Sequence, residues 1–403
     1  MATRVLIADK LPPAARTRLQ SAGFEVQADA SLKDESLLEA LKGFQPAALI
    51  VRSTKVTAAH VEAASELQLV VRAGAGVNTI DLDAASSRGV YVSNCPGMNA
   101  VAVAELAWGH IINADRQIAD NVSDLRQGQW RKKTYGKAGR GLKGRTLGVV
   151  GCGAIGKAVI ARALAFEMDV FAWSPSLTPK KAKRLGVRYA DDAVEVARQA
   201  DVLTVHVALT PATRGFIGEA IFEAMRPGSI LINTTRGEVL DEAALARAVR
   251  EKGIRAGLDV FCGEPSSDGE WRTPLADMPG VYGTHHIAAS TLQAQEAVAD
   301  EACRVVEQWQ STGQAPNCVN LARVTPATHM LVVRHADEVG VLAHVLGALS
   351  AAQINVQQME NIIFSGDEGA ACARVQVEGH PGETLVSEIK GHPHVLDVGV
   401  VEI

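Results

Sequence analysis

Short apolar runs recur along the first 286 residues, and each has the length of a β-strand. Val, Ile and Leu dominate these runs, as in strands that are buried on both faces. Between most of them lie Ala-rich segments with helical spacing, such as 157–166, 193–200 and 241–253. Alternating strands and helices predict an α/β protein whose parallel sheets are covered on both sides. The predicted strands are residues 4–9, 47–53, 67–74, 90–94, 146–151, 169–173, 201–209, 229–235, 255–261 and 281–286.

The alternation ends near residue 310. The stretch "STGQAPNCVNLARVTPATH" (311–329) has the Gly, Pro and polar content of a linker. After it, the pattern predicts a strand at 330–335, a helix at 339–352, two strands within 355–366 and 372–379, a helix at 382–391 and a strand at 395–403. The order βαββαβ is that of a ferredoxin-like unit.

Composition and charge limit the class of protein. With 403 residues, 47% hydrophobic and 21% charged, the chain is expected to form two or three globular domains. A net charge of −5 gives no basic surface for nucleic acid or membrane. "MATRVLIADK" lacks the apolar core and small-residue cleavage site of a signal peptide, so export is not expected, and "AVAVAELAWGHII" (100–112) is expected to be a buried helix. Six cysteines without a C-x-x-C pair predict reduced thiols in the cytoplasm and no metal site.

A glycine-rich motif follows the strand at 146–151. Gly151, Gly153 and Gly156 form G-x-G-x-x-G between this strand and a helix. Such glycines let the backbone turn tightly and approach a pyrophosphate at the helix N-terminus, which predicts a dinucleotide site. The next strand ends where an acid usually binds the adenosine ribose, and that position holds Ser174.

Polar residues follow three later strands, at the sheet edge where ligands bind in such folds. They are Arg236 in "NTTRGEVLDE", Asp259 and Glu264 in "LDVFCGEP", and Thr284, His285 and His286 in "THHIAAST". Taken singly, each has a structural interpretation as a turn residue, a solvated charge or a packed histidine. Together, an Arg, a Glu and a His beside a dinucleotide site predict hydride transfer. The His exchanges the hydroxyl proton, the carboxylate fixes its tautomer, and the Arg binds a substrate carboxylate.

These motifs, in this order, resemble the D-2-hydroxyacid dehydrogenase family over nearly the whole chain. The resemblance implies two doubly wound, Rossmann-like domains and a C-terminal ACT domain. Residues 1–98 and 287–321 would form the substrate-binding domain, 99–286 the dinucleotide-binding domain and 326–403 the ACT domain. It implies that Arg236, Glu264 and His286 are catalytic. His285 stands where the family usually has proline, which makes it the weaker candidate for the proton.

The resemblance also implies further ligand contacts. The small residues of "RAGAGVN" are expected to leave the amides of Gly74, Ala75 and Gly76 free for a carboxylate. The implied substrate-binding residues are Arg52, Ser53, Arg72, Gly74, Ala75, Gly76, Arg236 and His286. The implied cofactor neighbours are Ala75, Gly151, Gly153, Ala154, Ile155, Gly156, Ser174, His206, Ala208, Thr234, Arg236, Asp259, His286 and Ala288. "WRKK" (130–133) resembles a segment that brings cations to a substrate phosphate from a partner subunit; a solvated charged face is the alternative.

The ACT unit favours the phosphoglycerate dehydrogenase subgroup, which oxidises 3-phosphoglycerate with NAD at the start of serine synthesis. A hydroxypyruvate or glyoxylate reductase is the alternative within the family, and an NAD(H)-sensing corepressor-like protein is the alternative outside it. Ser174 repels nothing, so NADP stays possible. Lys180 and Lys181 could neutralise a 2′-phosphate or form a solvated basic helix end.

The resemblance implies a homodimer or homotetramer and suggests an amino-acid effector. "RHADEVGVL" matches a loop that binds serine between ACT domains, with His335, Asp337 and Asn355 as the implied contacts. Asp337 departs from the amide of the serine-inhibited pattern, and an ionised acid cannot donate a hydrogen bond. An ACT pair that serves only as a dimer interface is the alternative.

Overall fold

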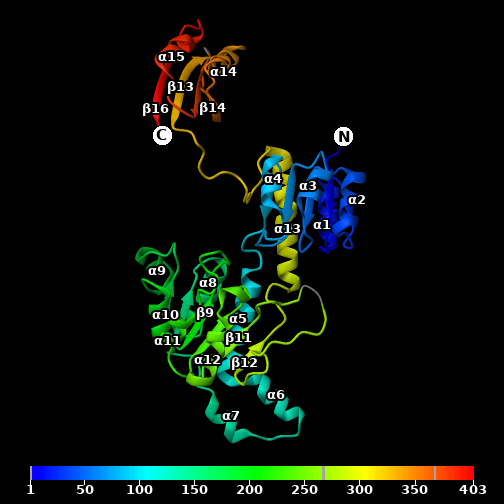
Figure 1. Cartoon of the computed structure of the whole chain (residues 1–403), viewed down its shortest axis with the longest axis vertical. Coiled ribbons are helices and arrows are strands. Elements are labelled where there is room, and N and C mark those ends of the chain that lie inside the picture. The colour runs from blue at the N-terminus through cyan, green and yellow to red at the C-terminus, as the bar shows by residue number, and fades with distance from the viewer. Residues whose placement is uncertain (1, 266–267, 367–368) are drawn as a thin grey trace. The chain divides into compact units, whose positions relative to one another are not determined.

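The computed structural model describes residues 2–265, 268–366 and 369–403, which divide into two compact units, Met1–Asn320 and Leu321–Ile403. The first unit contains two parallel sheets (Figure 1). The first sheet has the strand order β2-β1-β3-β4-β5. Its strands are β1 (Arg4–Ile7), β2 (Glu25–Ala28), β3 (Ala48–Val51), β4 (Leu69–Arg72) and β5 (Tyr91–Asn94). The chain reverses direction across this sheet between β1 and β3, which is the switch point where ligands bind in doubly wound folds.

The second sheet has the order β12-β11-β10-β9-β6-β7-β8, a Rossmann arrangement extended by β12. Its switch point lies between β6 and β9. Its strands are β6 (Thr146–Val150), β7 (Asp169–Trp173), β8 (Arg188–Tyr189), β9 (Val202–Val205), β10 (Ile230–Asn233), β11 (Arg255–Leu258) and β12 (Val281–Gly283). All neighbours in both sheets pair in parallel, as the alternating pattern predicts.

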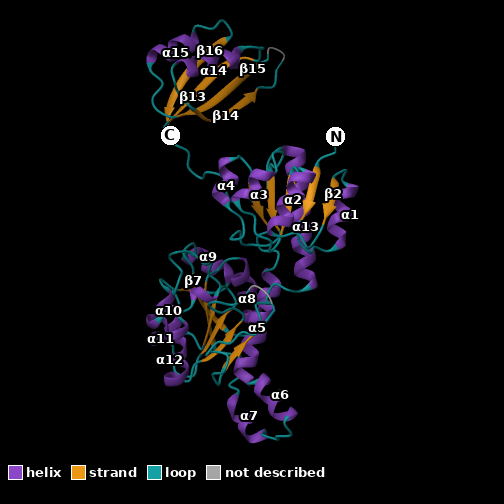
Figure 2. Ribbon diagram, turned by 45° about the vertical axis from the view of Figure 1, so that its right-hand side comes forward, coloured by secondary structure: helices purple, strands orange, loops and turns teal. Residues whose placement is uncertain are grey.

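Helices cover both faces of each sheet (Figure 2). On the first sheet, α1 (Pro13–Ser21) and α13 (Leu292–Thr312) pack on one face, and α2 (Asp34–Phe44), α3 (Ala58–Ala63) and α4 (Leu82–Ser87) on the other. On the second sheet, α5 (Ala100–Arg116), α8 (Ala154–Ala165) and α9 (Pro179–Leu185) pack on one face, and α10 (Ala193–Gln199), α11 (Glu219–Ala224) and α12 (Glu242–Lys252) on the other. The expected buried helix at 100–112 is the N-terminal part of α5. None of the helices in the described residues could span a membrane.

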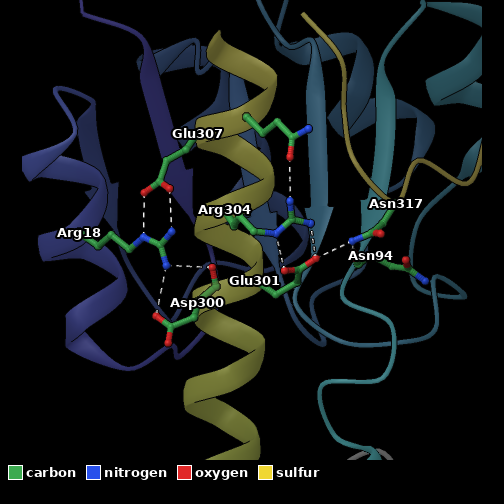
Figure 3. Close-up of polar contacts among 8 residues, drawn as sticks. Arg18, Asn94, Asp300, Glu301, Arg304, Glu307 and Asn317 are labelled. Carbon is green, nitrogen blue, oxygen red and sulfur yellow. Dashed lines mark hydrogen bonds and ion pairs between the residues drawn. The ribbon is translucent and has the colours of Figure 1, made fainter. Parts of the chain in front are cut away.

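Polar contacts stabilise the packing of the long helix α13 on the first sheet (Figure 3). The Arg18 guanidinium of α1 donates two hydrogen bonds to the Glu307 carboxylate, at 2.8 and 2.7 Å. Glu301 pairs with Arg304 one turn later on the same helix. The Asn317 amide nitrogen donates to Glu301 at 2.7 Å, which ties the chain after α13 to the helix. A segment distant in sequence thus completes the fold of the N-terminal sheet.

The predicted linker is only partly a free connection. Cys318 forms an antiparallel bridge with Ser93 of β5, and Asn320 accepts a hydrogen bond from the Val92 amide at 2.9 Å. Residues up to Asn320 therefore belong to the first unit, and the second unit begins at Leu321. The polar residues that suggested a loop here make hydrogen bonds to the edge of a sheet.

The second unit is an antiparallel sheet with the order β14-β15-β13-β16 and two helices, as the βαββαβ pattern predicts. Its core contains Leu331, Val333, Val345, Val375 and Ile389. The elements are β13 (His329–Ala336), α14 (Val341–Ala351), β14 (Val356–Ile363), β15 (Ala370–Val377), α15 (Glu383–Lys390) and β16 (Val395–Glu402). The predicted fold class, with two parallel doubly wound sheets and a ferredoxin-like unit, is confirmed.

Candidate functional site

The three motif glycines meet different surroundings after β6. A Cβ on Gly151 would lie 2.4 Å from the His206 backbone oxygen, and one on Gly156 would lie 2.0 Å from the Gly151 oxygen. Gly151 also has a φ of 102°, which favours glycine. A Cβ on Gly153 would meet open space. Two glycines thus permit close packing and the third leaves the backbone before α8 accessible, which is the arrangement that a pyrophosphate needs.

The neighbours of this loop lie at the ends of adjacent strands. Ala154 and Ile155 begin α8, and Ser174 follows β7 directly. The Ser174 carbonyl accepts a hydrogen bond from the Leu177 amide at 2.9 Å, so residues 174–177 form a turn beside the glycine loop. The exposed Ala208 follows β9, and its carbonyl accepts from the Thr213 hydroxyl at 2.6 Å.

Two buried polar atoms at this sheet edge have no hydrogen-bond partner among the described residues: Nδ1 of His206 and Oγ1 of Thr234. The other ring nitrogen of His206 lies 2.9 Å from the Thr204 hydroxyl. Burial lowers the pKa of His206 to about 3, so its imidazole is neutral at pH 7. Buried polar atoms normally have partners, so both are candidates for contact with a bound cofactor.

Asn233 shapes the loop that carries Arg236. Its side-chain oxygen accepts from the Thr235 amide and hydroxyl, and its nitrogen donates to the Arg236 carbonyl at 3.0 Å. A Cβ on Gly237 would lie 2.1 Å from the Phe261 backbone, so the loops after β10 and β11 touch. The Arg236 guanidinium reaches toward the loop after β4, where its Nη2 lies 3.7 Å from a Cβ built on Gly76.

His286 and Glu264 form a short contact between the His286 Nδ1 and the Glu264 carboxylate. The other oxygen of Glu264 accepts from the Phe261 amide at 3.2 Å, which holds the carboxylate in place. His286 has a φ of 51°, an uncommon conformation for a residue other than glycine. His285 is exposed and makes no side-chain hydrogen bond within the described residues. The structure therefore gives the carboxylate partner to His286.

Asp259 holds the loop that carries His286 in position. Its buried carboxylate accepts from the Thr284 hydroxyl at 2.6 Å and from the amides of Ile287 and Ala288 at 2.9 and 2.8 Å. Thr284 in turn lies 3.0 Å from the buried His110 of α5. Asp259 and Ala288, both expected cofactor neighbours, thus also hold the loop that carries His286, through the Asp259 carboxylate and the Ala288 amide.

Asp9 has the same supporting role at the switch point of the first sheet. Its carboxylate accepts from the amides of Arg52, Ser53 and Thr54 at 2.6, 3.1 and 3.0 Å, and from the Ser53 hydroxyl at 3.1 Å. The loop after β3 is thereby folded around the end of β1. Ser53, an expected substrate contact, directs both its amide and its hydroxyl to Asp9.

The loop after β4 corrects one expectation. The Gly74 amide is not free, because it donates to the Arg72 carbonyl at 2.8 Å. The Ala75 carbonyl accepts from the Asn94 side chain at 2.6 Å, while the amides of Ala75 and Gly76 have no protein partner among the described residues. Two of the three expected amides thus stay open to a ligand.

Arg72 lies against Gly74, and its buried Nε has no partner among the described residues. Burial and, after it, the charges of Arg236 and Arg52 lower the pKa of Arg72 below its ordinary value. Within the described residues, none of these three guanidinium groups forms an ion pair with a carboxylate. The three guanidinium groups form a positive cluster, with the carboxylate of Asp9 as a nearby negative charge.

A cleft of about 170 Å³ brings residues of both sheets together. From the first sheet it is lined by Arg52, Arg72 and Gly74, and from the loop after β12 by His286. Asn99, just before α5, also lines it. Such a cleft can hold a small anion against arginines and next to a histidine that exchanges protons. No arrangement of three or more His, Cys, Asp or Glu side chains in the described residues could hold a metal ion.

The expected effector residues of the second unit do not converge. His335 is buried, and its two ring nitrogens contact the Ala336 carbonyl at 2.7 Å and the Asn361 side chain at 3.1 Å. Asp337 follows β13 at the end that pairs with Ala370, whereas Asn355 precedes β14 at the opposite end of β15. Eight strand residues separate the two ends, roughly 25 Å. One effector molecule could therefore not contact both residues of the same chain.

Asp9 and His110 are missing from the sequence-based prediction. In the sequence, Asp9 is marked only by its place at the end of the first apolar run. In the structure, this position lies next to the switch point of the first sheet. His110 lies inside an apolar helix and gave no signal, because its partner Thr284 is 174 residues away.

Comparisons with known proteins agree with this arrangement. Residues 108–288 match the family model of the NAD binding domain of D-isomer specific 2-hydroxyacid dehydrogenases. A D-3-phosphoglycerate dehydrogenase of Methanocaldococcus jannaschii is 38% identical over 323 residues, which cover 80% of this chain and 60% of that protein. The chain thus spans less than two thirds of that relative's length.

Two further proteins are similar over more of their own length. A D-3-phosphoglycerate dehydrogenase of Mycobacterium leprae is 34% identical over 422 residues, covering 98% of this chain and 78% of that protein. The crystal structure of an NAD⁺-bound 3-phosphoglycerate dehydrogenase of Entamoeba histolytica aligns with a TM-score of 0.65 and 26% identity, covering 80% of this chain and 99% of that one. The chain therefore belongs to the D-isomer specific 2-hydroxyacid dehydrogenase family.

Proposed function

We propose that the chain is a D-3-phosphoglycerate dehydrogenase, which oxidises 3-phosphoglycerate to 3-phosphohydroxypyruvate with NAD and so begins serine synthesis. The observation that carries this proposal is the cleft, where His286 of the His286–Glu264 pair faces the same space as Arg52 and Arg72. A proton-exchanging group and a cluster of three arginines fit a hydroxy acid with more than one negative charge.

The residues of the chain divide the reaction between them. In the oxidation, the C2–H bond breaks and its hydride leaves for the cofactor, while the C2 hydroxyl proton passes to His286 and a carbonyl forms. Glu264 engages Nδ1, which leaves Nε2 of His286 as the proton acceptor. Arg236, which reaches toward the loop after β4, is suited to bind the substrate carboxylate beside the amides of Ala75 and Gly76.

NAD, when bound, supplies the hydride acceptor. The open position of Gly153 and the first turn of α8 fit its pyrophosphate. The unpartnered Thr234 Oγ1 and the neutral His206 are suited to contact the half of the cofactor nearer the substrate. The buried Asp259 carboxylate accepts hydrogen bonds from Thr284, Ile287 and Ala288, so we assign it the positioning of the loop that carries His286.

The three arginines also favour a phosphorylated substrate. The carboxylate of 3-phosphoglycerate requires one bidentate arginine, and its phosphate adds a charge of about −1.5 to −2. Arg236 serves the first group, and Arg52 and Arg72 are left for the second. We further propose that Arg131, Lys132 and Lys133 of a second copy add to the phosphate site. In one chain, α6 (Ile118–Arg126) and α7 (Lys132–Ala138) project from the second sheet on the side away from the first (Figure 1).

The proposal includes a homodimer, because α6 buries none of its residues within the chain. Ile118, Val122 and Leu125 of this helix are 45%, 39% and 55% exposed, and their spacing places them on one face. Trp130, just after α6, is 80% exposed. An apolar face of this kind is typical of an interface.

For the second unit we propose an ACT domain that either binds an amino acid between two copies or serves as an interface. Asp337 and Asn355 lie at opposite ends of the sheet in one chain. An effector site that includes both residues would therefore need them from two different chains. A cytoplasmic location is supported by the six cysteines, all of which are free.

A substrate panel tests the proposed function. The full chain is assayed in the reducing direction with 3-phosphohydroxypyruvate, hydroxypyruvate, glyoxylate and other 2-oxo acids, each with NADH and with NADPH. We expect the phosphorylated acid to have the highest kcat/KM. A preference for hydroxypyruvate or glyoxylate would instead identify a reductase, and tight NADH binding without turnover of any acid would identify a sensor.

A further inference from the structure

A second cleft borders the glycine-rich loop, on the side of β7. Its volume is about 380 Å³. Cys152 of the glycine loop and Lys157 of α8 line one wall, and Ser176 and Leu177 of the turn after β7 line another. The remaining wall is α9, through Lys181, Arg184 and Leu185. The cleft therefore begins where the backbone would hold a pyrophosphate and extends along the end of β7, where the adenosine ribose lies in such folds.

The cleft is positively charged. Lys157, Lys181 and Arg184 line it, and no acidic side chain does. Within the described residues, none of the three forms an ion pair. The Lys181 ammonium donates to the Ser176 carbonyl at 2.8 Å, which draws this charge over the turn. Three cations without counter-charges attract an anion with more than one negative charge.

The end of β7 offers no competing carboxylate. A carboxylate at position 174 would accept hydrogen bonds from the ribose hydroxyls of NAD and repel a phosphate on the 2′ oxygen. Ser174 does not repel a phosphate, and its carbonyl closes the turn that places Ser176 in the cleft. The hydroxyl of Ser176 is a further donor for a phosphate oxygen.

We propose that this cationic cleft binds the 2′-phosphate of NADP(H), so that the chain accepts both nicotinamide cofactors. Lys157, Lys181 and Arg184 neutralise the phosphate, and Ser176 donates a hydrogen bond to it. The inference rests on the proposed function only in requiring that a nicotinamide dinucleotide binds at the glycine-rich loop.

Isothermal titration calorimetry with the full chain tests the proposal without turnover. The dissociation constants of NADH and NADPH are measured for the wild type and for the double variant Lys181→Ala, Arg184→Ala. We expect the wild-type constants to agree within about tenfold. Because the two removed cations would each make a charge-assisted hydrogen bond to the 2′-phosphate, the double variant should bind NADPH at least about tenfold more weakly and NADH almost unchanged.

A matched control removes two charges from the same helix outside the cleft. Lys180 and Lys183 are exposed and do not line it, so Lys180→Ala with Lys183→Ala should leave NADPH binding within about threefold of wild type. An equal loss in both double variants would show a general effect of charge and overturn the proposal. So would a wild type that binds NADH but binds NADPH a thousandfold more weakly, and that result would leave the proposed dehydrogenase function intact.

Discussion

At the scale of single residues, the adjacent histidines 285 and 286 have different surroundings. Only His286 contacts Glu264, and its loop is held by Asp259. Replacing His286 with Ala should lower kcat by roughly 10²- to 10⁴-fold, because general acid-base catalysis typically contributes that much. Binding of NADH should stay nearly the same. The matched variant His285→Ala should lose far less activity, and a larger effect at 285 would contradict the assignment.

Ser174 gives a second prediction at this scale. Ser174→Asp introduces a charge that repels the 2′-phosphate of NADP and accepts hydrogen bonds from the ribose of NAD. The wild-type ratio of kcat/KM for NAD and NADP should lie within about a hundredfold of unity, and the variant should shift it toward NAD by roughly 2 to 4 kcal/mol of selectivity. Steady-state kinetics with both cofactors measure this ratio. A wild-type preference for NAD of several thousandfold would mean that another residue supplies the repulsion.

The residues that could be predicted from the sequence are those with a local signature. Gly151, Gly153 and Gly156 have a fixed spacing between a strand and a helix, and Arg236 follows an apolar run directly. Asp9 could not be predicted in its role, because its carboxylate binds a loop more than 40 residues away. The partners of the Gly74 amide and the Asp259 carboxylate depend on backbone geometry that the spacing of residues does not determine.

At the scale of elements, the missed strands β2 and β8 share a physical cause. Both are edge strands, and β8 has only two residues. Only Val26 of β2 is buried, so "EVQA" has no continuous apolar run. The ten strands that the pattern predicted include every inner strand of the two parallel sheets. The predicted edge strands β5 and β12 each bury two residues, whereas β2 buries one and β8 none, so the amount of burial is what made a strand recognisable.

The helix α6 gives a prediction about assembly. Val122→Asp with Leu125→Asp places two charges on its exposed apolar face. Because burying unpaired carboxylates is costly, the variant should dissociate into monomers that stay folded. Light scattering after gel filtration gives the mass, and circular dichroism gives the helix content. Gln127→Asp, which changes a polar exposed residue near the end of the same helix, is the control and should leave the mass unaltered.

The start of α7 gives a prediction about substrate choice. Replacing Arg131, Lys132 and Lys133 with Gln should raise KM for 3-phosphohydroxypyruvate more than KM for hydroxypyruvate, if these cations serve the phosphate of a neighbouring copy. Arg131 already pairs with Asp124 at 3.3 Å, so its single variant should have the smallest effect. Equal losses for both acids would indicate damage to the fold, and an unchanged preference would leave the phosphate to Arg52 and Arg72.

At the scale of the whole molecule, buried His206 predicts how stability depends on pH. Its pKa is about 3 in the folded protein, against about 6.5 for an unperturbed histidine. Above pH 6.5 the group is neutral in both states and has no effect. Between pH 6.5 and 3 this histidine binds a proton in the unfolded chain but not in the folded one. The free energy of unfolding therefore decreases by about 1.4 kcal/mol for each unit by which the pH is lowered.

Urea denaturation at pH 7 and pH 5 measures this effect. The wild type should lose about 2 kcal/mol from His206 over this range. Burial also lowers the pKa of His110, which adds a loss of the same sign. His206→Gln should reduce the pH dependence, whereas His285→Gln at an exposed position should preserve it. An identical slope for the wild type and His206→Gln would show that His206 titrates normally in the folded protein.

The return of α13 to the first sheet has a consequence for synthesis on the ribosome. Val305, Val306 and Trp309 of this helix complete the core that contains Val5 and Val71. The N-terminal segment therefore emerges first, but the part of this face that α1 does not cover stays exposed until about 300 residues have been translated, whereas the strands of the second sheet follow one another without such a delay. During elongation, the nascent N-terminal sheet should be the part that needs protection by chaperones.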